Sequence, residues 1–108
     1  MADIFDVTED TFQKEVLDSP EPVLVDFSAV WCGPCKMLDP IVKQLAGEWK
    51  DKVKVVKIDA DQSPNILLQY GVMGIPTLLF FKDGEIIDRV TGYQPKDKLI
   101  AKFTPHFN

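Results

Sequence analysis

The two cysteines of this chain, Cys32 and Cys35, are separated by only two residues. On a helix, side chains three positions apart have Cβ atoms about 5–6 Å apart, so two such thiols can form a disulfide with little backbone movement. A cross-link over so short a loop adds little stability, because its expected stabilisation grows with the logarithm of loop length. The spacing therefore indicates a disulfide that is made and broken during a reaction.

A cysteine pair with this spacing is also half of a common zinc site. The sequence has no second pair, and its only histidine, His106, lies near the end of the chain. We therefore favour redox chemistry over a structural zinc ion. We expect His106 to be a solvated residue of the tail.

The composition is that of an ordinary globular protein, with 108 residues, 45% hydrophobic and 27% charged. A chain of this length can bury a core without metal or disulfide support, so we expect one domain over residues 1–108. The formal net charge of −5 disfavours nucleic acid or an anionic membrane as a partner. The first residues show no secretory signal, and no apolar stretch reaches the roughly 18 residues of a bilayer span. We therefore expect cytoplasmic localisation, where a paired thiol is more often catalytic or metal-binding than structural.

Hydrophobic periodicity predicts the elements that hold the cysteines in place. An edge strand is expected at residues 4–7, followed by a helix from an N-cap at Thr8 to about Leu17. A strand over Val23–Ala29, apolar on both faces, leads into a helix from Pro34 to about Trp49. The later segments predict a strand at 53–60, a short helix at 64–70, a hairpin of strands at 77–82 and 85–91, and a last helix from Gln94 that Pro105 ends. This order predicts an α/β fold with a mixed sheet and helices on both faces.

Asp26 interrupts the apolar strand that leads into the cysteine segment. One interpretation is a carboxylate that faces solvent where the strand is thinly covered. The other is a buried acid with a raised pKa that exchanges a proton with a neighbouring group. Because the strand runs directly into the cysteine segment, this acid could lie beneath the thiols.

The segment 25–36, Val-Asp-Phe-Ser-Ala-Val-Trp-Cys-Gly-Pro-Cys-Lys, resembles the active-site segment of the thioredoxin family. The resemblance covers essentially the whole chain. Further matching positions are Pro40, the strand 55–61, Gly74 to Thr77, Lys82 to Gly84, and Gly92. It implies a thioredoxin fold: a five-stranded mixed sheet of order 1-3-2-4-5, four flanking helices, and a cis peptide before Pro76.

Three residues depart from the family pattern. Ser28 stands where many members carry a second tryptophan, and Met73 replaces a common arginine. Trp49 is an additional aromatic residue, which we expect to pack rather than to act in chemistry. None of these changes removes a catalytic group.

The resemblance implies a general thiol–disulfide oxidoreductase that reduces protein disulfides. Cys32, at a helix N-terminus that stabilises a thiolate, would be the more exposed nucleophile. Cys35 would resolve the mixed disulfide, and Asp26 would accept and donate its proton. Lys57 would lie on the neighbouring strand and pair with Asp26; the alternative is a surface lysine.

The substrate would be a folded protein that presents a disulfide to a flat, apolar surface. For Trp31 and Met73 the alternative is ordinary core packing. Backbone groups at Ile75 could pair with an extended substrate segment. The residues implied for this surface are Trp31, Gly33, Pro34, Met73, Gly74, Ile75, Pro76 and Gly92.

The family resemblance also implies partners and a source of electrons. No cofactor would be bound, and NADPH would supply electrons through a thioredoxin reductase to a monomeric protein. Two alternatives remain at this point. The fold could serve as a binding or regulatory module, or the same chemistry could run in the oxidising or isomerising direction. The dipeptide Gly33-Pro34 favours the reductase.

Overall fold

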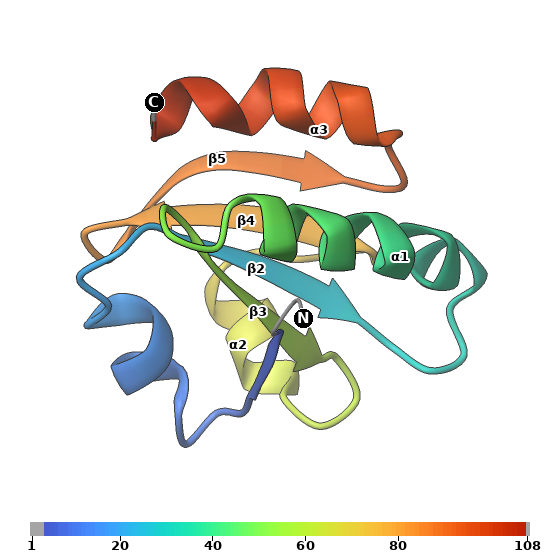
Figure 1. Ribbon diagram of the computed structural model, residues 1–108. Coiled ribbons are helices and arrows are strands. Elements are labelled where there is room, and N and C mark those ends of the chain that lie inside the picture. Colours follow the sequence, from blue (N-terminus) through green and yellow to red (C-terminus); the bar gives the residue numbers. More distant parts are fainter. Residues whose placement is uncertain (1–3, 108) are drawn as a thin grey trace.

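The computed structural model describes residues 4–107 and is built on a five-stranded sheet of order β1-β3-β2-β4-β5 (Figure 1). β1 pairs in parallel with β3 and β3 with β2, whereas β4 is antiparallel to β2 and β5 to β4. The expected mixed sheet and its strand order are confirmed. The strands are β1 (Phe5–Val7), β2 (Val23–Ser28), β3 (Lys54–Asp59), β4 (Thr77–Lys82) and β5 (Glu85–Thr91).

The helices divide between the two faces of the sheet (Figure 1). On one face, α1 (Gly33–Glu48) and α3 (Lys96–Phe103) pack on inward-facing residues that include Leu24 and Phe80. On the other face, the π-helical segment η1 (Gln13–Leu17) and α2 (Pro64–Gln69) pack on residues that include Val25 and Phe81. Both faces of β2 are therefore buried, which agrees with its continuous apolar pattern.

The alternation along β2 determines which face Asp26 occupies. Successive side chains of a strand point to opposite faces, so Asp26 shares the face of Leu24, two residues earlier. Leu24 belongs to the core beneath α1 and α3. The buried carboxyl group therefore lies on the side of the sheet that α1 covers.

The first helix is shorter than the sequence predicts, and the N-cap expected at Thr8 is wrong. Thr8 and Thr11 instead form a turn, in which the Thr8 N–H donates to Thr11 Oγ1 at 3.0 Å and the Thr11 N–H donates to the Thr8 carbonyl at 3.2 Å. The helix begins only at Gln13, after Phe12. The contact between Thr8 and Thr11 moves the start of the helix to Gln13, because a threonine side chain can bond to nearby backbone groups in place of the helical pattern.

The end of the chain is held against β5. After α3, a 3-10 turn η2 (Thr104–His106) places His106 Nε2 2.8 Å from Asp88 Oδ2, and the Lys102 ammonium lies 3.0 Å from Asp88 Oδ1. The His106 side chain is only 29% exposed. The expectation of a solvated tail histidine is therefore wrong, because a carboxylate on β5 binds it.

Trp49, at the end of α1, is 7% exposed and packs edge-on against the Phe107 ring at 5.0 Å between centroids. It is a packing residue, as expected. Within residues 4–107, the structure has no helix that combines the length and the apolarity needed to cross a membrane.

Candidate active site

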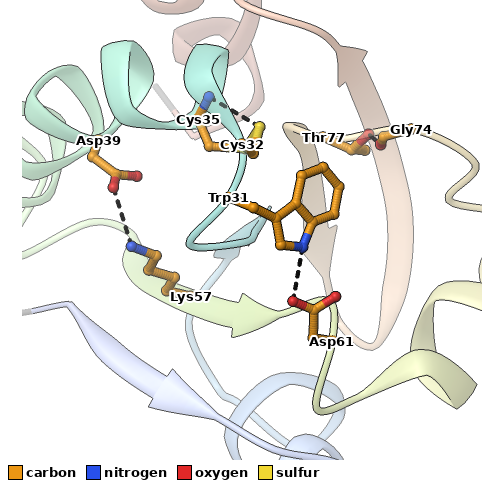
Figure 2. The surroundings of a disulfide bond; sticks show 8 residues. All are labelled: Trp31, Cys32, Cys35, Asp39, Lys57, Asp61, Gly74 and Thr77. Atoms are coloured by element: carbon orange, nitrogen blue, oxygen red, sulfur yellow. Dashed lines mark hydrogen bonds and ion pairs between the residues drawn. A yellow bond between two sulfur atoms is a disulfide. The ribbon is translucent and has the colours of Figure 1, made fainter.

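Cys32 is the N-cap of α1, and Cys35 lies in the first turn of that helix. Pro34 is compatible with this start because its missing N–H is not needed in the first turn. The Cys35 N–H donates a hydrogen bond to Cys32 Sγ at 3.2 Å, and the two residues are joined by a disulfide with Cα atoms 5.3 Å apart (Figure 2). The free N–H groups at the helix start and the helix dipole both favour negative charge on Cys32.

The exposure of the two sulfur residues differs less than expected. Cys32 is 4% exposed and Cys35 is 1% exposed, so both are buried in this disulfide form. They form a small apolar cluster with Ala29, against which Ile75 packs. Cys32, which we expected to be exposed, is therefore covered by its neighbours. The two cysteines differ in their position on the helix more than in their access to solvent.

The loop before β4 lies beside the disulfide, although it is about 40 residues later in the sequence. The Ile75-Pro76 peptide is cis, as the family resemblance implied, and Pro76 is buried. Gly92 adopts φ +90°, a left-handed conformation that favours glycine, and its N–H donates to the Pro76 carbonyl at 2.7 Å. The Thr77 hydroxyl donates to the Gly74 carbonyl (Figure 2). These contacts fix the cis-proline loop beside the cysteines.

Exposed apolar side chains lie in the two segments that meet at the cysteine pair, the residues just before Cys32 and the loop that carries Ile75. Trp31 is 66% exposed, Met73 98% and Val30 78%. The core-packing alternative for Trp31 and Met73 therefore does not hold. Gly33, Pro34 and Gly74 are exposed, while Ile75 and Gly92 are half-buried. Large apolar side chains that remain in solvent next to a reactive disulfide are typical of a protein-binding surface.

Asp26 is 2% exposed, and its Oδ1 atom has no hydrogen-bond partner in the described chain. Burial raises the pKa of Asp26 from its ordinary 3.8 to about 7; the negative charge of Asp39 also raises it, and Lys57 lowers it. The buried-acid interpretation of this residue agrees with the structure. A carboxyl group with a pKa near 7 can both accept and donate a proton at neutral pH.

Lys57 is the direct neighbour of Asp26 in the β2–β3 register, as expected, but it does not form the expected ion pair. Its Nζ atom lies 3.2 Å from Asp39 Oδ2 on α1 (Figure 2). Within residues 4–107 no ion pair joins Lys57 to Asp26. The pairing prediction is therefore wrong, because α1 brings a carboxylate that is about one-third exposed and so less costly to keep ionised than a buried one.

Two further residues of the site escaped the sequence reasoning, Asp39 and Asp61. Asp39 lies one helical turn after Cys35, so the period of α1 could have placed it near the cysteines. Asp61 Oδ2 accepts a hydrogen bond from Trp31 Nε1 at 2.8 Å. No local pattern signals this contact, since it joins two loops 30 residues apart. Within residues 4–107, no group of three or more histidine, cysteine or acidic side chains could hold a metal ion.

This geometry defines a class of protein, one that cycles between a dithiol and a disulfide at the start of a helix. A family model for thioredoxin matches residues 3–104. The chain is 53% identical over 94 residues to a thioredoxin of Rickettsia felis, covering 87% of this chain and 90% of the relative. It is 50% identical over 100 residues to thioredoxin 1 of Synechococcus elongatus, covering 93% and 94%. It is 45% identical over 102 residues to a chloroplastic M-type thioredoxin of Chlamydomonas reinhardtii, covering 94% and 73%.

The chain belongs to the thioredoxin family, and it is a thiol–disulfide oxidoreductase. The alternative of a binding module with secondary chemistry is not favoured, since the cysteine pair is present and disulfide-bonded.

Proposed function

We propose that this protein reduces disulfides of other proteins and is returned to its dithiol form by a thioredoxin reductase that uses NADPH. The observation that carries the proposal is the Cys32–Cys35 disulfide at a helix N-terminus, next to the exposed Trp31 and Met73. A small substrate would not require so much apolar surface around the sulfurs, whereas a folded protein can cover it.

In the first step, the Cys32 thiolate attacks one sulfur of the substrate disulfide. A bond forms between Cys32 Sγ and that sulfur, the substrate disulfide breaks, and the released thiolate takes a proton. The helix N-terminus assists because it stabilises the thiolate at Cys32, and the thiolate is the attacking species.

In the second step, Cys35 attacks Cys32 and releases the second substrate thiolate. The Cys32–Cys35 disulfide forms as the mixed disulfide breaks, so two electrons pass to the substrate in all. Cys35 is buried, and its thiol must lose a proton before it attacks. Asp26, on β2 beneath α1, is the proposed acceptor of this proton, and Lys57 modulates it from β3.

Substrate binding is proposed along the cis-proline loop. Ile75 already packs against the cysteine cluster, so a substrate sulfur that reaches Cys32 must pass close to it. An extended substrate segment could pair with the backbone at Ile75 as an added strand, while its side chains contact Trp31 and Met73. Gly33, Pro34, Gly74, Pro76 and Gly92 complete the proposed surface.

A turnover assay tests the proposal. The wild-type protein should reduce insulin disulfides with dithiothreitol, and also with NADPH and a thioredoxin reductase. A Cys32→Ser variant should be inactive in both, while a Trp49→Phe variant, changed outside the site, should retain activity. If the folded wild-type protein fails with both electron donors, the reductase assignment is wrong. Efficient oxidation of reduced substrates without reduction would favour the oxidising direction instead.

We further propose that the protein acts as a monomer in the cytoplasm. A reducing compartment supplies the conditions in which the dithiol form persists. Sedimentation of the reduced protein tests the first statement, and cell fractionation tests the second.

A further inference from the structure

Asp39 lies four residues after Cys35 on α1, so the two share a helix face. The Asp39 carboxylate binds the Lys57 ammonium with 3.2 Å between Oδ2 and Nζ (Figure 2), and both side chains are about one-third exposed. Neighbouring strands lie about 4.8 Å apart, so the Lys57 side chain starts directly beside Asp26, its partner in the β2–β3 register. Lys57 therefore has two carboxylates within reach and contacts only the one on the helix.

A cavity of about 200 Å³ between α1 and the sheet is lined by Asp26, Asp39 and Lys57. The unpartnered Asp26 Oδ1 atom is buried near it. The charged groups that line the cavity come from every element around it: Asp6 on β1, Asp26 on β2, Lys57 on β3, and Asp39 and Lys43 on α1. From β4, the register neighbour of Asp26 is Leu78, which carries no charge. Asp26 thus shares the cavity with four other charged groups, and Lys57 and Asp39 form the one ion pair among them in the described chain.

We propose that Asp39 is a positioning residue that controls proton binding by Asp26. It draws the Lys57 ammonium into an ion pair on α1 and adds its own negative charge to the shared cavity. Both effects favour the neutral carboxyl group on Asp26. The inference rests on the proposed role of Asp26 as the proton acceptor for Cys35.

The direction of the charge effects supports this assignment. The charge of Asp39 raises the pKa of Asp26, and the charge of Lys57 lowers it, while burial remains the largest cause of the raised value. Removal of Asp39 would take away a like charge and would also release Lys57 to approach Asp26. Both changes stabilise the ionised form of Asp26.

The test is a titration of the Asp26 carboxyl carbon by NMR on the oxidised protein, which requires no turnover. In Asp39→Asn, the midpoint should fall by about one pH unit, which corresponds to roughly tenfold weaker proton binding. Asp39→Glu keeps the charge and should restore most of the wild-type midpoint. Asp51→Asn is the matched control: it removes the same charge from an exposed turn beyond the end of α1, and it should leave the midpoint unchanged.

A double variant separates the two effects of Asp39. In a Lys57→Gln background, Asp39→Asn should lower the midpoint by less than it does in the wild-type background, because there is no ammonium to release. An unchanged Asp26 midpoint in Asp39→Asn would overturn the proposal. So would an equal shift in Asp51→Asn, which would mean that only net charge matters.

The pH dependence of insulin reduction gives a second readout. The pH at which activity changes half-way should move to lower values in Asp39→Asn, together with the NMR midpoint. If the midpoint moves but the wild-type protein reduces no substrate, the proposed function fails and the control of Asp26 stands. If the wild-type protein is active and the midpoint does not move, only the inference about Asp39 fails.

Discussion

Trp31 donates a hydrogen bond from its indole Nε1 to Asp61 Oδ2 at 2.8 Å, which joins the residue before Cys32 to the loop after β3 (Figure 2). Asp61 is itself held, since its N–H donates to Asp59 Oδ1 at 2.9 Å. The indole ring is thus held at one edge while the residue as a whole stays 66% exposed. A large side chain that is ordered before a partner arrives loses less entropy on binding.

Asp61→Ala should therefore weaken the reduction of protein substrates. We expect kcat/KM for insulin to fall about fivefold, mostly through KM, since one hydrogen bond of about 1 kcal/mol orders the ring. A small aromatic disulfide that does not need the surface should be reduced at the wild-type rate. Equal losses with the two substrates would show that Asp61 acts on the cysteines and not on Trp31.

Asp26→Asn should stabilise the protein at alkaline pH. At about pH 4–7 the folded protein holds a proton on Asp26 that the unfolded chain has already released, so wild-type stability falls as pH rises. The raised pKa spans about three pH units at about 1.4 kcal/mol each, so the cost above pH 7 is at most about 4 kcal/mol. Urea unfolding at pH 8 should show the variant more stable by a few kcal/mol. This gain should shrink toward pH 4, and a gain independent of pH would contradict the argument.

Cys35→Ser should accumulate a mixed disulfide through Cys32, because the resolving thiol is gone. Mass spectrometry of the variant mixed with an oxidised substrate should show one covalent adduct per chain that reductant removes. The reciprocal Cys32→Ser variant should trap much less, since Cys35 lies within the first turn of α1 and lacks the N-cap position that stabilises a thiolate at Cys32. Equal trapping by both variants would refute the unequal roles of the two thiols.

Asp88→Asn should loosen the end of the chain in a pH-dependent way. Partial burial alone would raise the pKa of Asp88, but hydrogen bonds from His106, Lys102 and the Arg89 N–H outweigh it and lower that pKa. The resulting stability is present above about pH 4 and is lost as pH falls below it, when the wild-type carboxyl group also becomes neutral. We expect a loss of about 1 kcal/mol at pH 7 in urea unfolding. That loss should shrink as pH falls through the lowered pKa of Asp88, and Asp10→Asn on the exposed N-terminal turn should show neither effect.

Most helices and strands could be predicted from the sequence because their apolar residues recur with a clear helical or strand periodicity. The strands at 77–82 and 85–91 match to the residue, and α1 begins one residue earlier and ends one earlier than expected. The error at Thr8 has a local cause, since a threonine that is a good N-cap is also a good turn residue, and only the surrounding packing selects one. The strand order came from the family resemblance, because periodicity does not say which strands are neighbours.

The reacting residues can be read from the chain alone, because the spacing of Cys32 and Cys35 and the helix that starts there are local properties. The partners of the charged residues follow from the packing of segments that are distant in the sequence. Register brings Lys57 beside Asp26, but the packing of α1 on the sheet adds Asp39, and Lys57 pairs with it. The physical reason is that ion pairs depend on distance and solvation in space. Neither quantity is encoded by position along the chain.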